Sequence, residues 1–187
     1  YAPLLDDLGD TNNGGIYLED VGTFIPYQRT SEESLYSLEE LFRHEFTHYL
    51  TGRYIIPGLF GSDLYANERL TWFDEGMSEF MAGATQADGN KPRTILMTLI
   101  EEDGTDTLSV SDVTHSTYST GFRFYQYAGM FLYFLNQRHR QTLWDLISAL
   151  QGSDVARYDA IVAQMSADSS LDNEYGQMLA DLISTPD

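Results

Sequence analysis

The spacing of apolar and polar positions predicts a long helix early in the chain. Leucine and aromatic residues recur every three or four positions, at Leu35, Leu38, Leu41, Phe42, Phe46 and Tyr49. This interval places them on one face of a helix. Thr30 and Glu33 have the spacing of a capping box, and Gly52 is a typical helix end. We therefore expect a buried helix over residues 32–50.

Extended segments are expected before this helix. Residues 14–19 have the pattern of a short strand that begins with Gly14 and Gly15, and residues 23–27 that of a second strand. Pro26 places the second strand at an edge or a strand end. The paired glycines allow either a simple turn or the close approach of another backbone, such as a peptide pairing with an edge strand.

The rest of the chain has largely helical patterning. We expect a loop over residues 53–68 and an irregular segment over residues 108–120. Helices are expected over residues 69–84, 92–101, 122–138, 142–151, 155–165 and 171–183. The fold class is therefore α+β but mostly α-helical. We expect one unit over residues 1–187, with the strands, first helix and loop in residues 1–68 and the second helix and helical remainder in 69–187.

Charge and composition exclude several classes of partner. The chain has 29 acidic and 10 basic residues, which gives a formal net charge of −19. Such a field repels nucleic acids and anionic membranes and favours cations. No apolar run has the length of a membrane span, and the absence of cysteine excludes disulfides and cysteine-ligated metals. We expect neither nucleic-acid binding nor membrane insertion.

The candidate chemistry lies near the end of the first helix, where residues 44–48 read His-Glu-x-x-His. Residues four apart lie on one helix face, so His44 and His48 can direct imidazole nitrogens at a single metal ion. Glu45 lies on the adjacent edge, within reach of a water on that metal. Two imidazoles, a third ligand and a water form the open tetrahedral site of a catalytic zinc. The third ligand must come from another element.

Acidic residues of the second helix are candidates for that ligand. Glu75 and Glu79 are one turn apart in a segment rich in aromatic residues, and Asp74 precedes Glu75. Buried carboxylates in such a setting are costly unless they are paired or bind a metal. The second helix is therefore expected to complete the zinc site.

Several segments resemble a single family when they are taken together. They are residues 14–19, 37–43, 44–54, 67–76, 115–118 and 124–128. In this combination they resemble the peptidase unit of secreted bacterial collagenases of the clostridial and bacillar type, which are gluzincin zinc metallopeptidases. The resemblance implies a thermolysin-like catalytic subdomain, with a short edge strand over the active-site helix and a helical C-terminal half. The family's activator region and its small helper subdomain are not expected within these residues.

The resemblance also implies roles for individual residues. Zinc would be held by His44, His48 and Glu75, with Glu45 as the general base. Glu79 would accept a hydrogen bond from the far nitrogen of a ligand histidine, which we expect to be His44. Asp74 and Glu79 are the rival third ligands.

Substrate contacts are implied at the cleft. Tyr118 matches the tyrosine that donates a hydrogen bond to the oxyanion, and His115 is its rival. Gly14 and Gly15 match a double-glycine edge strand that holds the substrate backbone in extended form. Phe60 stands where the family usually has a bulky aromatic residue, here phenylalanine in place of tryptophan.

A structural calcium ion is a further implication of the resemblance. Its ligands would be the carboxylate of Glu19 and the backbone carbonyls of Tyr54, Ile56 and Gly58. These are hard oxygen ligands, which calcium prefers, and they would brace the end of the active-site helix.

We expect a secreted zinc endopeptidase that hydrolyses collagen, gelatin or collagen-like peptides by metal-activated water. No signal segment follows Tyr1, so we interpret the chain as a piece of a longer precursor. One alternative is a gluzincin endopeptidase or aminopeptidase without a preference for collagen. Another is a metal-stabilised module that binds collagen without cutting it, although such a module would have no use for Glu45.

Overall fold

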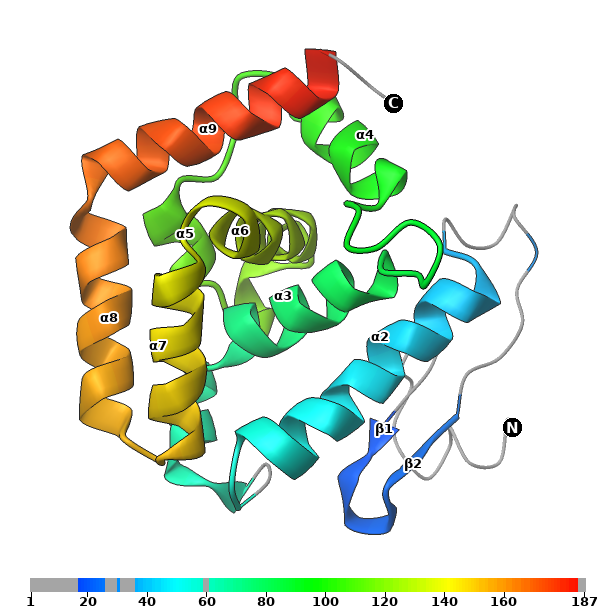
Figure 1. The fold of residues 1–187 in the computed structure, drawn as a ribbon, viewed down its shortest axis with the longest axis vertical. Helices are drawn as coiled ribbons and strands as arrows, with labels where there is room; N and C mark the ends of the chain where they lie inside the picture. The colour runs from blue at the N-terminus through cyan, green and yellow to red at the C-terminus, as the bar shows by residue number, and fades with distance from the viewer. Residues whose placement is uncertain (1–16, 26–29, 31–35, 59–60, 185–187) are drawn as a thin grey trace.

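A computed structural model of the chain describes residues 17–25, 30, 36–58 and 61–184. Over these residues it is mostly α-helical, with one small antiparallel sheet (Figure 1). Strand β1 (Tyr17–Leu18) pairs with β2 (Thr23–Phe24), and Tyr17 lies opposite Phe24. The predicted class is confirmed, while the division into segments 1–68 and 69–187 stays a prediction.

Helix α6 (Phe124–Arg138) is the centre of the helical core. Figure 1 shows it end-on, with α3 (Thr71–Ala82), α4 (Thr94–Glu102), α7 (Arg140–Gln151), α8 (Val155–Ala167) and α9 (Ser169–Ser184) around it. Its buried residues are mostly large and apolar, among them Phe131, Phe134 and Leu135. The helices predicted from residue 69 onward are confirmed, with ends that differ by a few residues.

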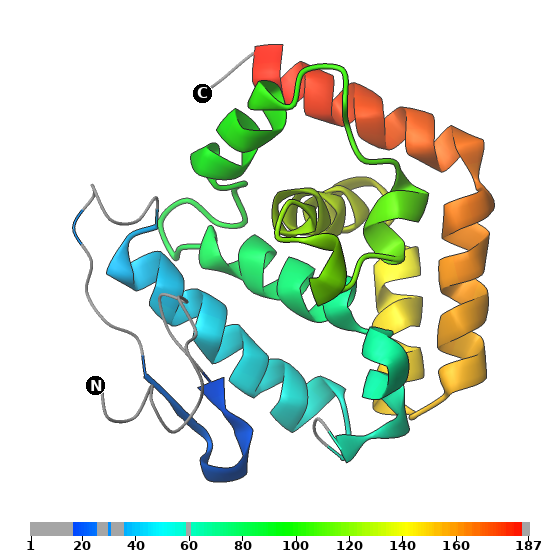
Figure 2. The same cartoon turned by 180° about the vertical axis from the view of Figure 1, so that it is seen from behind.

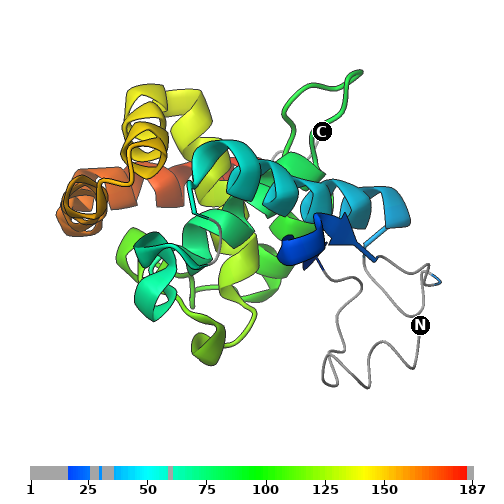
Figure 3. The same cartoon turned by 90° about the horizontal axis from the view of Figure 1, so that it is seen from below.

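The predicted metal-binding helix, α2 (Leu38–Leu50), lies beside α3 and runs in the opposite direction (Figures 1 and 2). Helix α3 is buried along most of its length between α2 and α6. The β1–β2 hairpin lies along the outer side of α2, and Figure 3 shows it on the opposite side of the molecule from α8. Polar side chains that α2 turns toward α3 are therefore enclosed.

The predicted start of the first helix was wrong, whereas its predicted end at Leu50 matches the end of α2. Ser37 has an extended backbone and caps α2: its hydroxyl accepts from the Glu40 backbone N–H, and the Glu40 carboxylate accepts from the Ser37 backbone N–H. The helix therefore begins at Leu38 and not at residue 32. At its other end the chain continues through Gly52 in a π-helical turn, Thr51–Ile55. Glycine allows the chain to leave a helix but does not force it to, so helical turns can continue past Gly52.

The prediction that the apolar face of this helix is buried was also wrong. Leu38, Phe42 and Phe46 are 42%, 48% and 40% exposed, while Glu45 and Thr47 are buried. The aromatic face meets the hairpin, where the Phe24 ring lies 4.6 Å from that of Phe42. Amphipathic spacing locates two faces of a helix but does not say which one the neighbouring elements cover.

Two predicted irregular segments contain short helices. Ser109 and Asp112 form a capping box that begins α5 (Val110–Thr114), and a 3-10 turn, η5 (Tyr118–Thr120), follows. The expected loop at 53–68 ends in the 3-10 segment η4 (Asp63–Glu68). Asn67 and Glu68 have φ angles of 59° and 56°, a left-handed conformation that is uncommon for residues other than glycine.

Two glycines allow α3 and α6 to approach closely. A Cβ on Gly76 would lie 2.9 Å from the backbone and the side chain of Ala128. A Cβ on Gly129 would lie 2.7 Å from the Cβ of Glu79. Both distances are shorter than real side-chain contacts, so glycine is required for the helix crossing that positions Glu75 and Glu79.

Gly76→Ala is expected to lower the free energy of unfolding by about 1–3 kcal/mol, because the added methyl overpacks the crossing. Urea unfolding followed by circular dichroism measures this change. Gly176→Ala is the matched control, since a Cβ there meets no atom within 4 Å. That substitution is expected to leave stability unchanged or to raise it by up to about 1 kcal/mol through helix propensity. Equal effects of the two substitutions would contradict the close-approach argument.

Candidate metal centre

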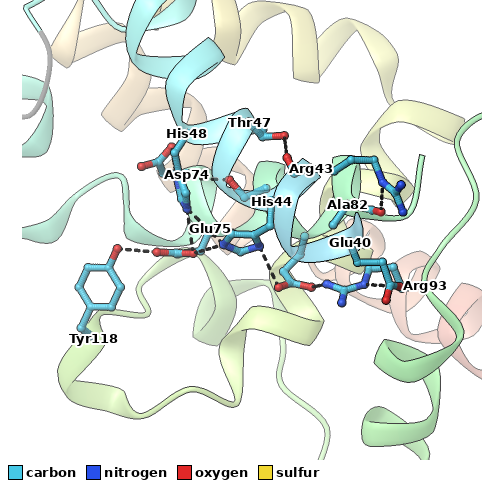
Figure 4. A network of polar contacts seen from close by, with 12 residues as sticks. Glu40, Arg43, His44, Thr47, His48, Asp74, Glu75, Ala82, Arg93 and Tyr118 are labelled. Carbon is cyan, nitrogen blue, oxygen red and sulfur yellow. Dashed lines mark hydrogen bonds and ion pairs between the residues drawn. The ribbon is translucent and has the colours of Figure 1, made fainter. Parts of the chain in front are cut away.

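Three potential ligand atoms converge between α2 and α3 (Figure 4). The two Nε2 atoms of His44 and His48 are 3.2 Å apart. The Oε2 atom of Glu75 lies 3.3 Å from Nε2 of His44 and 3.5 Å from Nε2 of His48. Within the described part of the chain, no other group of three His, Cys, Asp or Glu residues has this arrangement.

This triangle fits a zinc ion. Zinc binds imidazole nitrogen and carboxylate oxygen at about 2.0–2.2 Å, so two ligands at tetrahedral angles are about 3.3–3.6 Å apart. The three observed separations match this spacing. The Oε2 atom of Glu75 is also buried without a hydrogen-bond partner among the described residues. A buried carboxylate oxygen without a hydrogen-bond partner is expected to contact an ion or a water molecule.

Carboxylates orient both histidines from their far nitrogens. Nδ1 of His44 lies 3.1 Å from Oε1 of Glu79, the pairing expected from the sequence. Nδ1 of His48 lies 3.3 Å from Oδ1 of Asp74 and 3.3 Å from the hydroxyl of Ser78. A protonated Nδ1 leaves the Nε2 lone pair free for a metal. Asp74 and Glu79 therefore lie where they orient the histidines, while Glu75 faces both Nε2 atoms.

Without a metal, the two histidines and Glu75 carry opposite charges. Burial disfavours the charged form of His44, but the Glu75 and Glu79 carboxylates outweigh it and raise its pKa to about 9. Burial is likewise outweighed at His48, where Asp74 and Glu75 raise the pKa well above its ordinary value. Burial also opposes ionisation of Glu75, yet the two imidazoles hold its pKa well below the usual range. The site thus concentrates positive charge beside Glu75, where a divalent cation would replace the protons.

Glu45 lies on α2 directly after His44 and is buried. Burial raises the pKa of its carboxyl group, and the neighbouring His44 and His48 oppose that rise in part. A carboxylate with a raised pKa accepts protons more readily than an exposed one. Its place beside the ligand triangle suits a general base.

Tyr118 reaches the same centre from the η5 turn. Its hydroxyl donates a hydrogen bond of 2.6 Å to Oε1 of Glu75. Its backbone N–H donates to the carboxylate of Glu68 at 3.0 Å, which ties the turn to the left-handed segment. Burial and Glu75 raise the pKa of Tyr118, so its hydroxyl remains a donor. His115 instead contacts the Ser111 carbonyl of its own helix, 2.8 Å from Nδ1.

Several predicted substrate and calcium residues cannot be placed relative to this centre. Gly14, Gly15 and Phe60 lie outside the described residues, as does the side chain of Glu19. Their substrate and calcium roles stay predictions. The carbonyls proposed for calcium belong to Tyr54, Ile56 and Gly58.

The carbonyl of Tyr54 accepts a hydrogen bond of 3.2 Å from Gln151. A carbonyl has two lone pairs, so this contact leaves room for a metal ion.

Sequence reasoning missed the roles of three residues around the site. Asp74 was weighed as a ligand and not as a partner of His48. The Tyr125 ring lies parallel to the imidazole of His44 at 6.5 Å, and Arg93 pairs with Glu79. A carboxylate directly before Glu75 was a visible signal for Asp74. Arg93 had no local signal, because its partner is 14 residues away.

Comparisons with known proteins identify related sequences. Residues 9–178 match a protein family described as "Collagenase". The chain is 42% identical to Collagenase ColT of Clostridium tetani and 43% identical to Collagenase ColQ1 of Bacillus cereus, each over 179 residues. These alignments cover 94% and 95% of this chain. A Microbial collagenase of Vibrio alginolyticus is 27% identical over 177 residues, which is 88% of the chain.

The chain spans only part of these relatives. It corresponds to 18% of the length of the Clostridium tetani and Bacillus cereus proteins and to 20% of the Vibrio alginolyticus protein. None of the helices in the described ranges is long and apolar enough to cross a membrane.

Proposed function

The chain belongs to the collagenase family, and on that premise we propose that it is the zinc-binding catalytic part of an endopeptidase acting on collagen, gelatin or collagen-like peptides. The observation that carries this proposal is the triangle of His44, His48 and Glu75 with Glu45 beside it. The names of the relatives support a collagen-type substrate.

The residues of the centre support hydrolysis of a peptide bond. Zinc held by His44, His48 and Glu75 would act as a Lewis acid and make water nucleophilic near neutral pH. Glu45 takes the proton of the attacking water and delivers it to the leaving amine. Tyr118, whose hydroxyl already lies 2.6 Å from a ligand oxygen, donates a hydrogen bond to the oxyanion of the substrate.

Two other functions are separable from this one. A peptidase without a preference for collagen would use the same centre on a different substrate. A module that binds collagen without cutting it would hold zinc but have no need of a buried carboxylate beside the ligands. The position of Glu45 therefore favours the enzymes.

The location and the second metal are further proposals. Collagen lies outside cells, so the proposed substrate implies an enzyme that acts after secretion. A calcium ion bound by Glu19 and the carbonyls of Tyr54, Ile56 and Gly58 would brace the π-helical turn after α2.

The chain is expected to bind one zinc ion per molecule and to cleave gelatin ahead of glycine in Gly-Pro-rich segments. Elemental analysis after dialysis measures the metal, and mass spectrometry of the peptides maps the cleavage sites. Casein and aminoacyl amides are the comparison substrates, and a chelator-treated sample is the control. Equal cleavage of casein would favour the general peptidase. Stoichiometric zinc without hydrolysis of any substrate would favour the binding module.

A further inference from the structure

A chain of charged groups leads away from the metal centre on the far side of His44 (Figure 4). Nδ1 of His44 contacts Oε1 of Glu79, as described above. The other oxygen of Glu79 accepts a hydrogen bond from Nη1 of Arg93. Nε of Arg93 donates to Oε1 of Glu40 at 3.2 Å. Arg93 thus joins two carboxylates, one of which contacts a predicted zinc ligand.

Burial makes these pairings necessary. The side chains of Arg93 and Glu79 are only 2% and 4% exposed. An unpaired guanidinium or carboxylate in such a place would lose its hydration without compensation. The guanidinium also lies 4.2 Å from the centre of the Tyr36 ring, a favourable cation–π contact. The buried charge of Arg93 is therefore compensated by Glu79, and that of Glu79 by Arg93.

The backbone around Arg93 is packed tightly against the end of α3. Arg93 is the N-cap residue of α4, with an extended backbone. A Cβ on Gly83 would lie 2.9 Å from Cγ of Arg93 and 2.6 Å from the carbonyl oxygen of Lys91. Only glycine at position 83 leaves room for this approach. Arg93 is consequently held in place from its backbone to its guanidinium.

The pairing constrains the direction of the Glu79 carboxylate. The terminal torsion of a glutamate is broad, so an unpaired carboxylate could turn away from its histidine. Arg93 engages Oε2, which leaves Oε1 facing Nδ1 of His44. On the other side, Gly129 packs against the Cβ of Glu79. Glu79 is therefore held at both its base and its tip.

Glu40 links the same network to the start of α2. Its Oε1 pairs with Arg93, and its Oε2 accepts from the backbone N–H and the hydroxyl of Ser37. Glu40 lies four residues before His44, on the same face of the helix. Arg93 thus contacts both Glu40, which caps α2, and Glu79, which orients His44.

We infer that Arg93 is a positioning residue for the metal centre, which it serves by holding the Glu79 carboxylate on Nδ1 of His44. The inference rests on the zinc site proposed above. Removing a partner that orients a metal-binding histidine typically weakens metal affinity 10–100-fold. Arg93→Met, which keeps the length of the side chain and removes its charge, is expected to weaken zinc binding by about that factor.

A double-mutant cycle separates positioning from general stabilisation. Zinc affinity is measured by competition with a chromophoric chelator for the parent chain, Arg93→Met, Glu79→Gln and the double variant. If Arg93 acts through Glu79, the double variant binds zinc within about twofold of Glu79→Gln alone. The absorption spectrum of bound cobalt is expected to change alike in the two single variants. Losses of zinc affinity that multiply in the double variant would overturn the inference.

Arg123 offers a control that is matched in its contacts but not in its burial, since its side chain is 32% exposed. It too uses Nε and Nη1 to bridge two carboxylates, those of Asp103 and Asp106, and it lies over the Tyr127 ring. Arg123→Met is expected to lower the thermal midpoint of the metal-free protein but to leave zinc affinity within about twofold of the parent, since it contacts no group of the metal centre. A similar loss of zinc affinity in both arginine variants would also overturn the inference.

The cycle stays decisive if Arg93→Met does not fold. Arg93→Lys then takes its place, because lysine keeps the charge but cannot pair with two carboxylates through a planar fork. It is expected to weaken zinc binding when residue 79 is Glu and not when it is Gln. If the parent chain binds zinc and the Arg93 variant binds it with equal affinity, this inference is contradicted but the proposed function is not. A parent chain without stoichiometric zinc contradicts the proposed function as well.

Discussion

Glu45→Gln is expected to bind zinc as the parent does and to lose nearly all peptidase activity. Glutamine has the shape of glutamate, so the buried site beside His44 and His48 keeps its packing. Its amide cannot accept the proton of the attacking water or deliver one to the leaving amine. Loss of a positioned general base lowers turnover by about 10²–10⁴-fold. Steady-state kinetics on a gelatin-derived peptide, with zinc analysis of the same sample, measure both properties.

Glu39→Gln is the control for this substitution. Glu39 lies on the same helix, but its side chain is 88% exposed, and it pairs with Arg43 at 4.0 Å. Its replacement is expected to leave both zinc content and turnover unchanged. Substantial turnover in Glu45→Gln would contradict the assignment of Glu45 as the general base. A loss of zinc in that variant would show that Glu45 contributes to binding of the metal.

Glu75→Ala is expected to abolish stoichiometric zinc binding. Its Oε2 lies 3.3 Å and 3.5 Å from the two Nε2 atoms, so its removal leaves the two imidazoles without the carboxylate that completes their triangle. Peptidase activity should disappear with the metal. Elemental analysis after dialysis and chelator competition measure the loss.

Asp74→Ala and Glu79→Ala give the matched comparison on the same helix. Both carboxylates contact Nδ1 atoms and not Nε2 atoms, so their loss is expected to weaken zinc binding by only about 10–100-fold. Retention of stoichiometric zinc in Glu75→Ala would mean that Asp74 or Glu79 is the third ligand. The ranking of the three variants therefore tests the ligand assignment directly.

The local features of this chain were predictable from its sequence. His44 and His48 share a helix face because four residues nearly complete one turn, whatever surrounds them. Similarly, Glu75 and Glu79 follow from the pattern of the second helix, and the later helices follow from their amphipathic spacing. An error arose at the start of the first helix, where the Ser37–Glu40 capping box begins α2. Glu33 of the capping box predicted with Thr30 lies outside the described residues.

The tertiary structure decided which of these residues meet. Tyr118 lies 43 residues from Glu75, and Arg93 lies 53 residues from Glu40, so no local periodicity relates them. It also decided that α2 turns its polar face toward α3 and leaves Phe42 and Phe46 half-exposed beside the hairpin. Which face is buried depends on the elements packed against the helix.

The sequence by itself therefore determined a helix able to offer two imidazoles and a base, with acidic candidates for a third ligand on the next helix. The tertiary structure places Glu75 at the Nε2 atoms and Glu79 at Nδ1 of His44, as the family resemblance implied, and it alone paired Asp74 with Nδ1 of His48. The physical reason is that hydrogen bonds within one helix turn depend on neighbours in the chain. The direction of a buried carboxylate, by contrast, depends on every charge packed around it.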